Sequence, residues 1–446
     1  MISPGSKAEA DAFELWKRLR PDEAYVAGIP EAAGRFFIPT ATNVRRVHGQ
    51  IAKIRRSTKD ATVRKFLASL DAELTLPEPS RAPESMVASL FGYMIKEGVD
   101  AGHMRSLAVE GGKALEAQRR RYRGKRWPPG MRALVQLSAS GLAEIVDIVA
   151  KQLQLTGENR TALDAVASLR RTLERYRKTF DLPGFRPEAG FEETYAFFKE
   201  NGAELGRSRT YPRALRDLWD YTETPKQVES AGLRMMRREL PRFRTVTVAL
   251  AGDLHCDPTS EEVMKTLRAR TGLRPGQILP FLNAVRGPCQ RVAAKHVVAI
   301  NPQYTVLVIE TPPYLVNTTP SGAAYSIDGL TDRPKEVFMA TTDERTSARP
   351  PPGDLLNLLI HEEYGHCVHG SNSAHAFAGA PTLLDVLGSP LGCLSEGIAF
   401  QRELEFLPVM NGIVSGRYDG PEERAFAEAL EAWGGLTAVA RPYEFR

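Results

Sequence analysis

Apolar side chains recur every three or four residues along most of residues 1–240 of this chain. That spacing places them on one face of an α-helix and predicts helices whose apolar faces pack together. Two turn-rich stretches, residues 76–80 and 181–184, are expected to be loops between groups of helices. The pattern predicts an all-α region, and its clearest helical segments are residues 14–20, 63–74, 87–99, 140–155, 162–180 and 224–240.

The pattern changes at about residue 291. Short segments rich in β-branched and aromatic residues now alternate with Pro, Gly, Asn and Asp, which is typical of strands joined by turns. We therefore expect a mainly α protein with a small antiparallel β-sheet in the second of two regions, 1–240 and 241–446. The expected strand segments are residues 291–300, 304–311, 323–329 and 335–343.

Composition indicates a folded, soluble protein without a nucleic-acid partner. The 446 residues include 59 basic and 54 acidic side chains, so the net charge of +5 gives only a mild positive field. The four cysteines form no C-x-x-C pair, which argues against a disulfide framework or a cysteine zinc site. No apolar run approaches the ~18 residues of a membrane span, and the N-terminus has no signal-peptide core. We expect a cytoplasmic protein with no membrane partner.

One dense basic stretch, residues 119–126, precedes Trp127-Pro128-Pro129-Gly130 and is typical of a helix end that runs into a turn. Charge runs of this kind usually form a solvated helix terminus. A contact with an anion or a phosphate is the alternative interpretation.

The segment from Asp354 to Gly370 carries the strongest chemical signal. Its first two turns are nearly all apolar, so we expect a helix that is buried on most sides. The segment then becomes polar: four of the eight histidines stand at positions 361, 366, 369 and 375, next to a Glu-Glu pair. Polar groups in a buried helix are costly unless they are paired. Either a metal ion or neighbouring side chains must satisfy them.

Zinc would be such a partner, because two imidazoles and a carboxylate leave a fourth position for a water that a nearby glutamate can deprotonate. In the usual H-E-x-x-H motif the two histidines share one face of a helix. His361 and His366 are five residues apart, and on a regular α-helix they would diverge by about 140°. A π-bulge or a break near Gly365 would restore a common face. Glu362 is the preferred base, and Glu363 is the second choice.

The next predicted helix, residues 394–406, offers a third ligand. Glu396 lies near the start of this helix, where a carboxylate either binds the metal or is favoured by the helix dipole. Glu403 lies about two turns later on the same face. It is expected either to hydrogen-bond a ligand or to replace Glu396 as the ligand. One zinc ion is the expected cofactor.

Four segments in the same order resemble zinc metallopeptidases of the gluzincin clan, and most closely the bacterial group named domain of unknown function 885. That group shows T-P-P-Y, a strand ending in A-A-Y, H-E-x-x-P-G-H and an E-G-W-A-x-Y helix. The matching segments here are residues 311–314, 321–325, 361–366 and 396–400. The resemblance implies a large helical metallopeptidase fold, in which residues 1–240 form cleft walls and residues 241–446 form the catalytic region with the sheet beside the active-site helix.

Residue by residue, the resemblance implies His361, His366 and Glu396 as zinc ligands and Glu362 as base. The proline of the group's motif is missing here, so the histidine spacing of five lies between the four of H-E-x-x-H and the six of the group. The group is related in motif to thimet oligopeptidase-like and carboxypeptidase Taq-like enzymes, and residues 363–370 are similar to the E-F-G-H-A-x-H-G of the thimet type. That similarity favours Glu363, so the base stays open between the two glutamates.

The resemblance further implies a substrate site. In these peptidases a strand at the cleft edge pairs with the substrate backbone, and Gly322, Ala323 and Ala324 stand where that strand is expected. A tyrosine or histidine from a later loop usually holds the oxyanion. Because relatives continue for many more residues, a truncated C-terminus is expected, and Tyr325 and Tyr314 are the nearest substitutes for that residue.

The leading hypothesis is a zinc-dependent peptidase or amide hydrolase that acts on a peptide or a small amide. The second is a non-catalytic helical protein that keeps the fold without a productive metal site and binds peptides or a partner. A third is a metal-dependent tailoring enzyme for a small amide-containing metabolite. Stoichiometric zinc separates the first hypothesis from the second.

Overall fold

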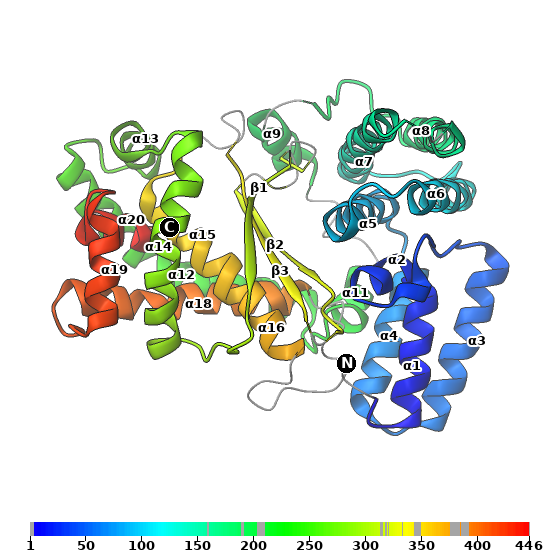
Figure 1. Cartoon of the computed structure of the whole chain (residues 1–446), viewed down its shortest axis with the longest axis horizontal. Coiled ribbons are helices and arrows are strands. Elements are labelled where there is room, and N and C mark those ends of the chain that lie inside the picture. The colour runs from blue at the N-terminus through cyan, green and yellow to red at the C-terminus, as the bar shows by residue number, and fades with distance from the viewer. Residues whose placement is uncertain are drawn as a thin grey trace. The chain divides into compact units, whose positions relative to one another are not determined.

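The chain, described by a computed structural model, is mainly α-helical and forms two compact units (Figure 1). Unit 1 comprises residues 1–222, 327–334 and 381–390, and unit 2 comprises residues 223–326, 335–380 and 391–446. The residues that the structure describes are 4–157, 160–188, 191–202, 210–312, 315–316, 319, 321–331, 333–342, 349–374, 384 and 392–445.

Unit 1 is built from helices, and polar residues begin several of them. The side chains of Ser6, Asp60 and Asp100 accept hydrogen bonds from backbone N–H groups in the first turns of α1, α4 and α6. The helices of unit 1 are α1 (Lys7–Leu19), α2 (Pro21–Val26), α3 (Ala41–Ser57), α4 (Ala61–Thr75), α5 (Arg81–Glu97), α6 (Ala101–Tyr122), α7 (Pro129–Leu155), α8 (Arg160–Thr179), α9 (Phe191–Asn201) and α11 (Tyr211–Asp217).

Four of these helices, α5 to α8, pack against one another and are seen nearly end-on in Figure 1. α7 is long and apolar enough to cross a membrane, with 56% of its apolar window buried. It packs against α5 and α8, and its side chains Val135, Leu142 and Ile145 are fully buried. It is therefore a core helix of unit 1.

Unit 2 combines helices with the sheet. The boundary expected after residue 240 falls inside α12, and the two units instead divide between Thr222 and Glu223. The helices of unit 2 are α12 (Pro225–Leu254), α13 (Ser260–Thr271), α14 (Pro275–His296), α15 (Pro352–Leu359), the π-helical turn η2 (Ile360–Cys367), α16 (Val368–Ala374), α18 (Gly392–Val414), α19 (Pro421–Glu431) and α20 (Leu436–Phe445).

The sheet contains β1 (Val306–Glu310), β2 (Gly322–Ile327) and β3 (Lys335–Ala340) in the order β1-β3-β2. β1 runs parallel to β3, with Val306 opposite Glu336 and Glu310 opposite Ala340. The sheet is therefore mixed, and the prediction of an antiparallel sheet is wrong for this pair. The reason is the connection between the two strands. After β1 the chain first forms β2, which lies on the other side of β3, and only then forms β3 between β1 and β2.

The first of the four expected strands is also wrong. Residues 291–296 form the last turns of α14 instead, where Val292 and Ala293 are fully buried. The alanines and charged residues of this segment allow a helix, and burial in the core of unit 2 outweighs the β-propensity of its valines. The other three expected segments overlap β1, β2 and β3, although β2 begins one residue earlier than expected.

Most elements of unit 2 share an apolar core, and a second cluster lies between α12, α13 and Phe445. The first core joins α14, β3, α15, η2, α18 and α20, and it includes Phe281, Phe338, Leu359, Phe406 and Tyr443. The helix of residues 354–370 is buried on most sides, as its apolar first turns predict. The core therefore fixes the two helical segments that carry the polar cluster, η2 and α18.

Candidate metal centre

The helix that carries His361 and His366 changes its winding where the sequence predicts a bulge. α15 continues into η2 and then into α16 without interruption. The N–H of Val368 donates to the carbonyl of Glu363, five residues back, which is the hydrogen bond of a π-helix. The predicted π-winding is confirmed.

This winding brings the two histidines together. Their ring centroids are 5.0 Å apart and the ring planes are inclined by 74°. A π-turn holds one more residue than an α-turn, so residues five apart share a face in η2 much as residues four apart do in an α-helix. The extra residue that breaks the H-E-x-x-H spacing is thus accommodated by the backbone.

Helix α18 supplies a carboxylate to the same place. Oε2 of Glu396 lies 3.3 Å from Nε2 of His361, and Oε1 lies 3.7 Å from Nε2 of His366. One possible ligand atom from each residue lies within 4.8 Å of the other two. Ligands of a tetrahedral zinc are about 3.3 Å apart, given bonds of about 2.0–2.1 Å. The structure therefore brings the three predicted ligands into nearly the separation that zinc requires.

The close approach of α18 to η2 depends on Gly365. A Cβ atom at this position would lie 2.5 Å from both Cα and Cβ of Ala399, which is closer than real contacts allow. Ala399 is fully buried and lies one turn after Glu396 on α18. The glycine that we expected to loosen the winding therefore has a different role: it clears the space in which α18 carries Glu396 to the histidines.

A hydrogen-bond chain orients His361. Its Nδ1 lies 2.6 Å from Oε1 of Glu403, whose Oε2 accepts a hydrogen bond of 2.9 Å from the side-chain amide of Asn357. The backbone carbonyl of Glu403 accepts a hydrogen bond of 2.8 Å from the hydroxyl of Tyr443. Because a carboxylate accepts the Nδ1 proton, the Nε2 lone pair is left for a metal. Glu403 is placed as the partner of a ligand, which was one of the two roles expected for it.

His366 has a different partner. Its Nδ1 lies 2.9 Å from Oγ of Ser395, the residue before Glu396. Burial lowers the pKa of His366, whereas hydrogen bonding to Glu403 and the nearby charges of Glu362, Glu403 and Glu396 outweigh burial and raise the pKa of His361. Each imidazole is held through Nδ1 and turns Nε2 towards Glu396. Two such nitrogens and a carboxylate oxygen are a donor set that fits zinc.

Sequence reasoning missed Ser395, Asn357 and Tyr443. Two of them had a signal that could have been used: Asn357 stands four residues before His361 in a run of leucines, and Ser395 directly precedes Glu396. Tyr443 lies on α20, far along the chain, and only the fold brings it to Glu403.

Glu362 lies between the histidines and the sheet. Its side chain is buried, with the residue 7% exposed, and its carboxylate accepts a hydrogen bond from the backbone N–H of Ala324 on β2. Burial raises the pKa of Glu362 to about 7, against the opposing charge of His361 and the hydrogen bond from Ala324. A carboxyl with a pKa near neutrality can both take up and release a proton.

Glu363 has different surroundings. It is 0% exposed, and its Oε2 accepts a hydrogen bond of 2.7 Å from Nε of Arg286 on α14. Burial raises the pKa of Glu363, while the charge and hydrogen bond of Arg286 oppose that effect. Glu363 thus forms a buried ion pair between η2 and α14, whereas Glu362 lies on the side of β2.

The expected substrate strand is an edge strand of the sheet. Gly322, Ala323, Ala324 and Tyr325 are half-buried residues of β2, which pairs with β3 on one side. A Cβ at Gly322 would lie 2.6 Å from the carbonyl oxygen of Met339, so this glycine is needed for close pairing with β3. Side chains alternate along a strand, so Tyr325 projects to the opposite face of β2 from Ala324.

Three other residues singled out in the sequence, Tyr314, His369 and His375, are not part of this cluster as the structure describes it. Tyr314, the second candidate for the oxyanion and a predicted substrate contact, lies outside the described residues, as does His375. His369 lies on α16 and is exposed. It is not part of the group formed by His361, His366 and Glu396.

Comparison with known proteins finds no match: no protein family, no curated protein and no solved structure is similar to this chain.

Proposed function

We propose that unit 2 is a zinc-dependent hydrolase that cleaves a peptide or a related amide bond. The convergence of His361, His366 and Glu396 on one face of a π-helical turn carries this proposal. Three protein ligands that leave a fourth position open are the pattern of catalytic zinc sites, whereas structural sites are closed by four protein ligands. The expected ligand set and the resemblance to gluzincins support the same reading.

Zinc at this site would act as a Lewis acid and would make a water molecule acidic enough to lose a proton near neutral pH. The protein's own groups do the rest. Glu362 takes the proton from the attacking water and returns it to the leaving amine, because its carboxyl has a pKa of about 7. Glu403 and Ser395 hold the two imidazoles in one orientation. The ion pair of Glu363 with Arg286 supports Glu362 over Glu363 in this role.

The edge of β2 suits an extended peptide. Gly322, Ala323 and Ala324 have small side chains, and an edge strand has backbone groups that can pair with a substrate backbone. Ala324 also donates to Glu362, so a substrate on this edge would lie next to the proposed base. A peptide or a small peptide-like amide is therefore the expected substrate class.

Metal analysis of a Glu396→Ala variant, paired with cleavage of a fluorescence-quenched peptide library, tests this function. We expect one zinc per chain in the wild type, hydrolysis that a chelator abolishes, and loss of both zinc and hydrolysis in the variant. The matched control is Glu405→Ala, because Glu405 lies on the same helix but pairs with Arg402 and is not part of the group of possible ligands. This control should keep zinc and activity.

Two outcomes count against the proposal. A folded wild-type chain that binds no zinc under metal-replete conditions contradicts the metal site. Stoichiometric zinc without cleavage of any library member contradicts the hydrolase and favours a peptide-binding or partner-binding protein.

A further inference from the structure

Phe400 is an exposed aromatic side chain that contacts the candidate metal centre. It lies on α18, one turn after Glu396, and its ring centroid is 5.1 Å from that of His361, with the ring planes inclined by 76°. Although one side of the ring packs against this histidine, Phe400 is 57% exposed. The rest of the ring is therefore open to a molecule that approaches the histidines.

Leu404 extends this apolar surface along α18. It lies four residues after Phe400 and is 56% exposed. Residues four apart lie on the same face of an α-helix, so Phe400 and Leu404 form an apolar row that begins one turn after Glu396. Single exposed apolar side chains are ordinary on a protein surface. Two in one row that starts at a candidate ligand are instead typical of a binding surface.

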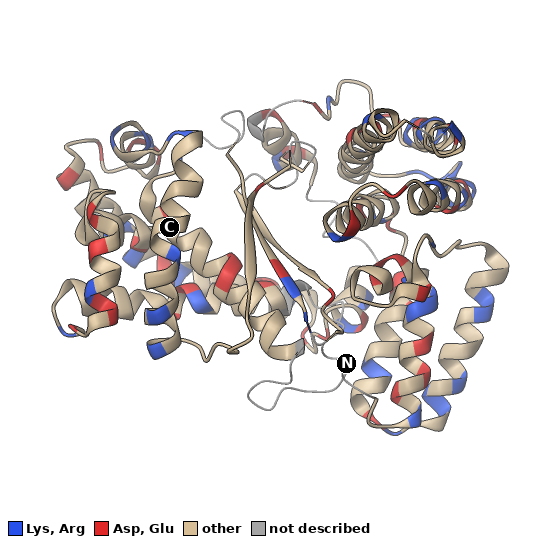
Figure 2. Cartoon of the chain, in the orientation of Figure 1, with Lys and Arg blue, Asp and Glu red and all other residues tan. Residues whose placement is uncertain are grey.

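The charged side chains of α18 are already paired. Besides Glu396, this helix carries Arg402, Glu403 and Glu405 as charged residues (Figure 2). Arg402 forms an ion pair with Glu405, and Glu403 lies 2.6 Å from Nδ1 of His361. The apolar row thus offers a substrate carbon atoms to contact and no charge of its own.

The metal centre is bordered by surfaces of two kinds. β2 offers backbone groups, and its Ala324 donates a hydrogen bond to Glu362. α18 offers the apolar row. In strand addition the backbone pairing supplies affinity, while contacts to side chains supply specificity. A peptide whose backbone pairs with β2 can therefore be selected by what its side chains meet on α18.

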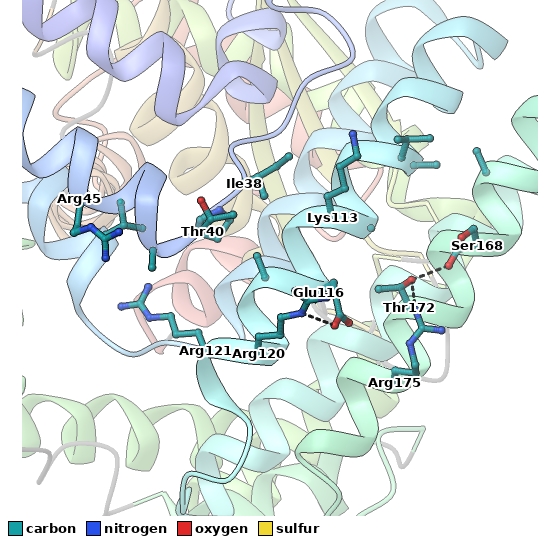
Figure 3. A pocket seen from close by; sticks show the side chains of 18 residues that line it. Ile38, Thr40, Arg45, Lys113, Glu116, Arg120, Arg121, Ser168, Thr172 and Arg175 are labelled. Atoms are coloured by element: carbon teal, nitrogen blue, oxygen red, sulfur yellow. Dashed lines mark hydrogen bonds and ion pairs between the residues drawn. The ribbon is translucent and has the colours of Figure 1, made fainter.

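A cavity of about 1090 Å³ in unit 1, between α3, α6 and α8, has a different character (Figure 3). Its cations do not converge, because Arg175 lies across the cavity from Arg45 and Arg121, and Arg120 pairs with Glu116 between them. Every residue that lines it belongs to unit 1, whereas the metal centre belongs to unit 2. The apolar row, by contrast, directly contacts a candidate ligand.

We propose that Phe400 and Leu404 select substrates with a large aliphatic or aromatic side chain next to the scissile bond. This inference rests on the proposed function, because it places the scissile bond at His361, His366 and Glu396. An apolar side chain gains binding free energy when it leaves water for the apolar row. A charged side chain there would lose hydration without gaining a partner.

Cleavage of a peptide library, with the cut sites identified by mass spectrometry, measures this selection. The wild type should cut next to Phe, Leu or Met with a kcat/KM at least ~10-fold higher than next to Asp or Lys. The double variant Phe400→Ala with Leu404→Ala should bring this ratio close to one. Leu404→Lys should increase cleavage next to Asp, because the new cation supplies a counter-charge.

Val414→Ala is the matched control. Val414 is also an exposed apolar residue of α18, at 41%, but it lies at the opposite end of the helix from Glu396. This control should keep the wild-type ratio. If Phe400 merely supported His361, its loss would lower zinc content or would lower kcat for all peptides alike, and the ratio would not change.

Fluorescence polarisation separates this inference from the proposed hydrolase. The probes are two labelled hexapeptides, one with Phe-Leu and one with Asp-Asp at its centre, flanked by glycines. A chelator prevents cleavage during the measurement. The full-length chain should bind the first peptide at least ~10-fold more tightly than the second, and the double variant should lose this difference. Such binding by a chain that cleaves no peptide supports the apolar row although the hydrolase fails.

The cleavage ratio decides where the chain cleaves the library, and the polarisation measurement decides where it does not. An apolar preference that the double variant retains, or no preference in the wild type, overturns the proposal while the hydrolase stands. In a chain without cleavage, equal affinity for the two hexapeptides or binding of neither overturns the proposal together with the hydrolase.

Discussion

Glu362 and Glu363 are neighbours in the chain but meet different chemical surroundings. Side chains of consecutive residues in a helix point in different directions. Glu362 therefore lies beside the histidines and β2, and Glu363 turns into the core towards Arg286. The sequence resembles two peptidase patterns, one of which favours Glu362 as the base and the other Glu363. The ion pair between Glu363 and Arg286 is the reason to prefer Glu362.

Glu362→Gln is expected to keep zinc and lose hydrolysis. The amide cannot accept a proton from water, so kcat should fall by about 10²–10⁴-fold, the usual contribution of a general base. The zinc content should not change, because Glu362 is not among the three ligands. A variant that retains full peptidase activity would move the base elsewhere and contradict the assignment.

Glu363→Gln is expected to affect stability instead. It leaves the guanidinium of Arg286 half-buried without its counter-charge, and removing one member of a buried ion pair costs on the order of 3 kcal/mol. Urea unfolding should show this loss, and the double variant Glu363→Gln with Arg286→Met should recover part of it. A large fall in kcat of the folded Glu363→Gln protein, with unchanged stability, would favour Glu363 as the base.

At the scale of elements, the proposed metal centre depends on two features: a π-helical turn that aligns the histidines, and a contact between Gly365 and Ala399 that lets α18 pack on that turn. The first compensates for a spacing of five. The second places Glu396 within 3.3 Å of His361. Neither feature contributes a ligand, yet the three ligands converge only if both are present.

Gly365→Ala is expected to displace α18 and weaken zinc binding. The added methyl would lie 2.5 Å from Ala399, and overpacking of this kind costs ~1–3 kcal/mol. Competition with a chromogenic chelator measures the zinc affinity. Gly397→Ala is the control, because a Cβ at Gly397 meets no neighbour. Equal zinc affinity in Gly365→Ala and Gly397→Ala would contradict the role given to Gly365.

At the scale of the whole molecule, buried ionisable groups couple folding to pH. Glu336 lies on β3, is almost fully buried, and accepts a hydrogen bond of 3.1 Å from the hydroxyl of Ser326. Burial raises the pKa of Glu336 to about 8, against the smaller opposing effect of that hydrogen bond. Its carboxyl is thus largely protonated in the folded protein at neutral pH.

The free energy of unfolding should therefore fall as pH rises from about 4.5 to about 8. In that window the folded state holds a proton that the unfolded state has released, and the loss is roughly 1.4 kcal/mol per pH unit for a single group. Glu336→Gln should remove this part of the pH dependence and make the variant more stable than the wild type near pH 8. Urea unfolding at several pH values measures both effects. Identical pH profiles for the two proteins would contradict this role of Glu336.

The sequence determined the features that depend on neighbours along the chain. Helical spacing of apolar residues located α1, α4, α5, α7 and α8 of unit 1. A metal shared by two histidines five residues apart predicted a π-bulge or a break, and η2 shows the π-winding. Local geometry is set by covalent bonds and by hydrogen bonds over a few residues, so a short stretch of sequence specifies it.

Only the tertiary structure decided which distant groups meet. It placed residues 291–296 in α14 and made β1 parallel to β3. It also paired Glu363 with Arg286 and placed the hydroxyl of Tyr443 against the backbone carbonyl of Glu403. It also showed that Gly365 allows close packing against Ala399, whereas the sequence had suggested that this glycine would loosen the helix. These outcomes depend on burial and on contacts between residues far apart in the chain, and no local pattern records which partner a side chain will meet once the core has formed.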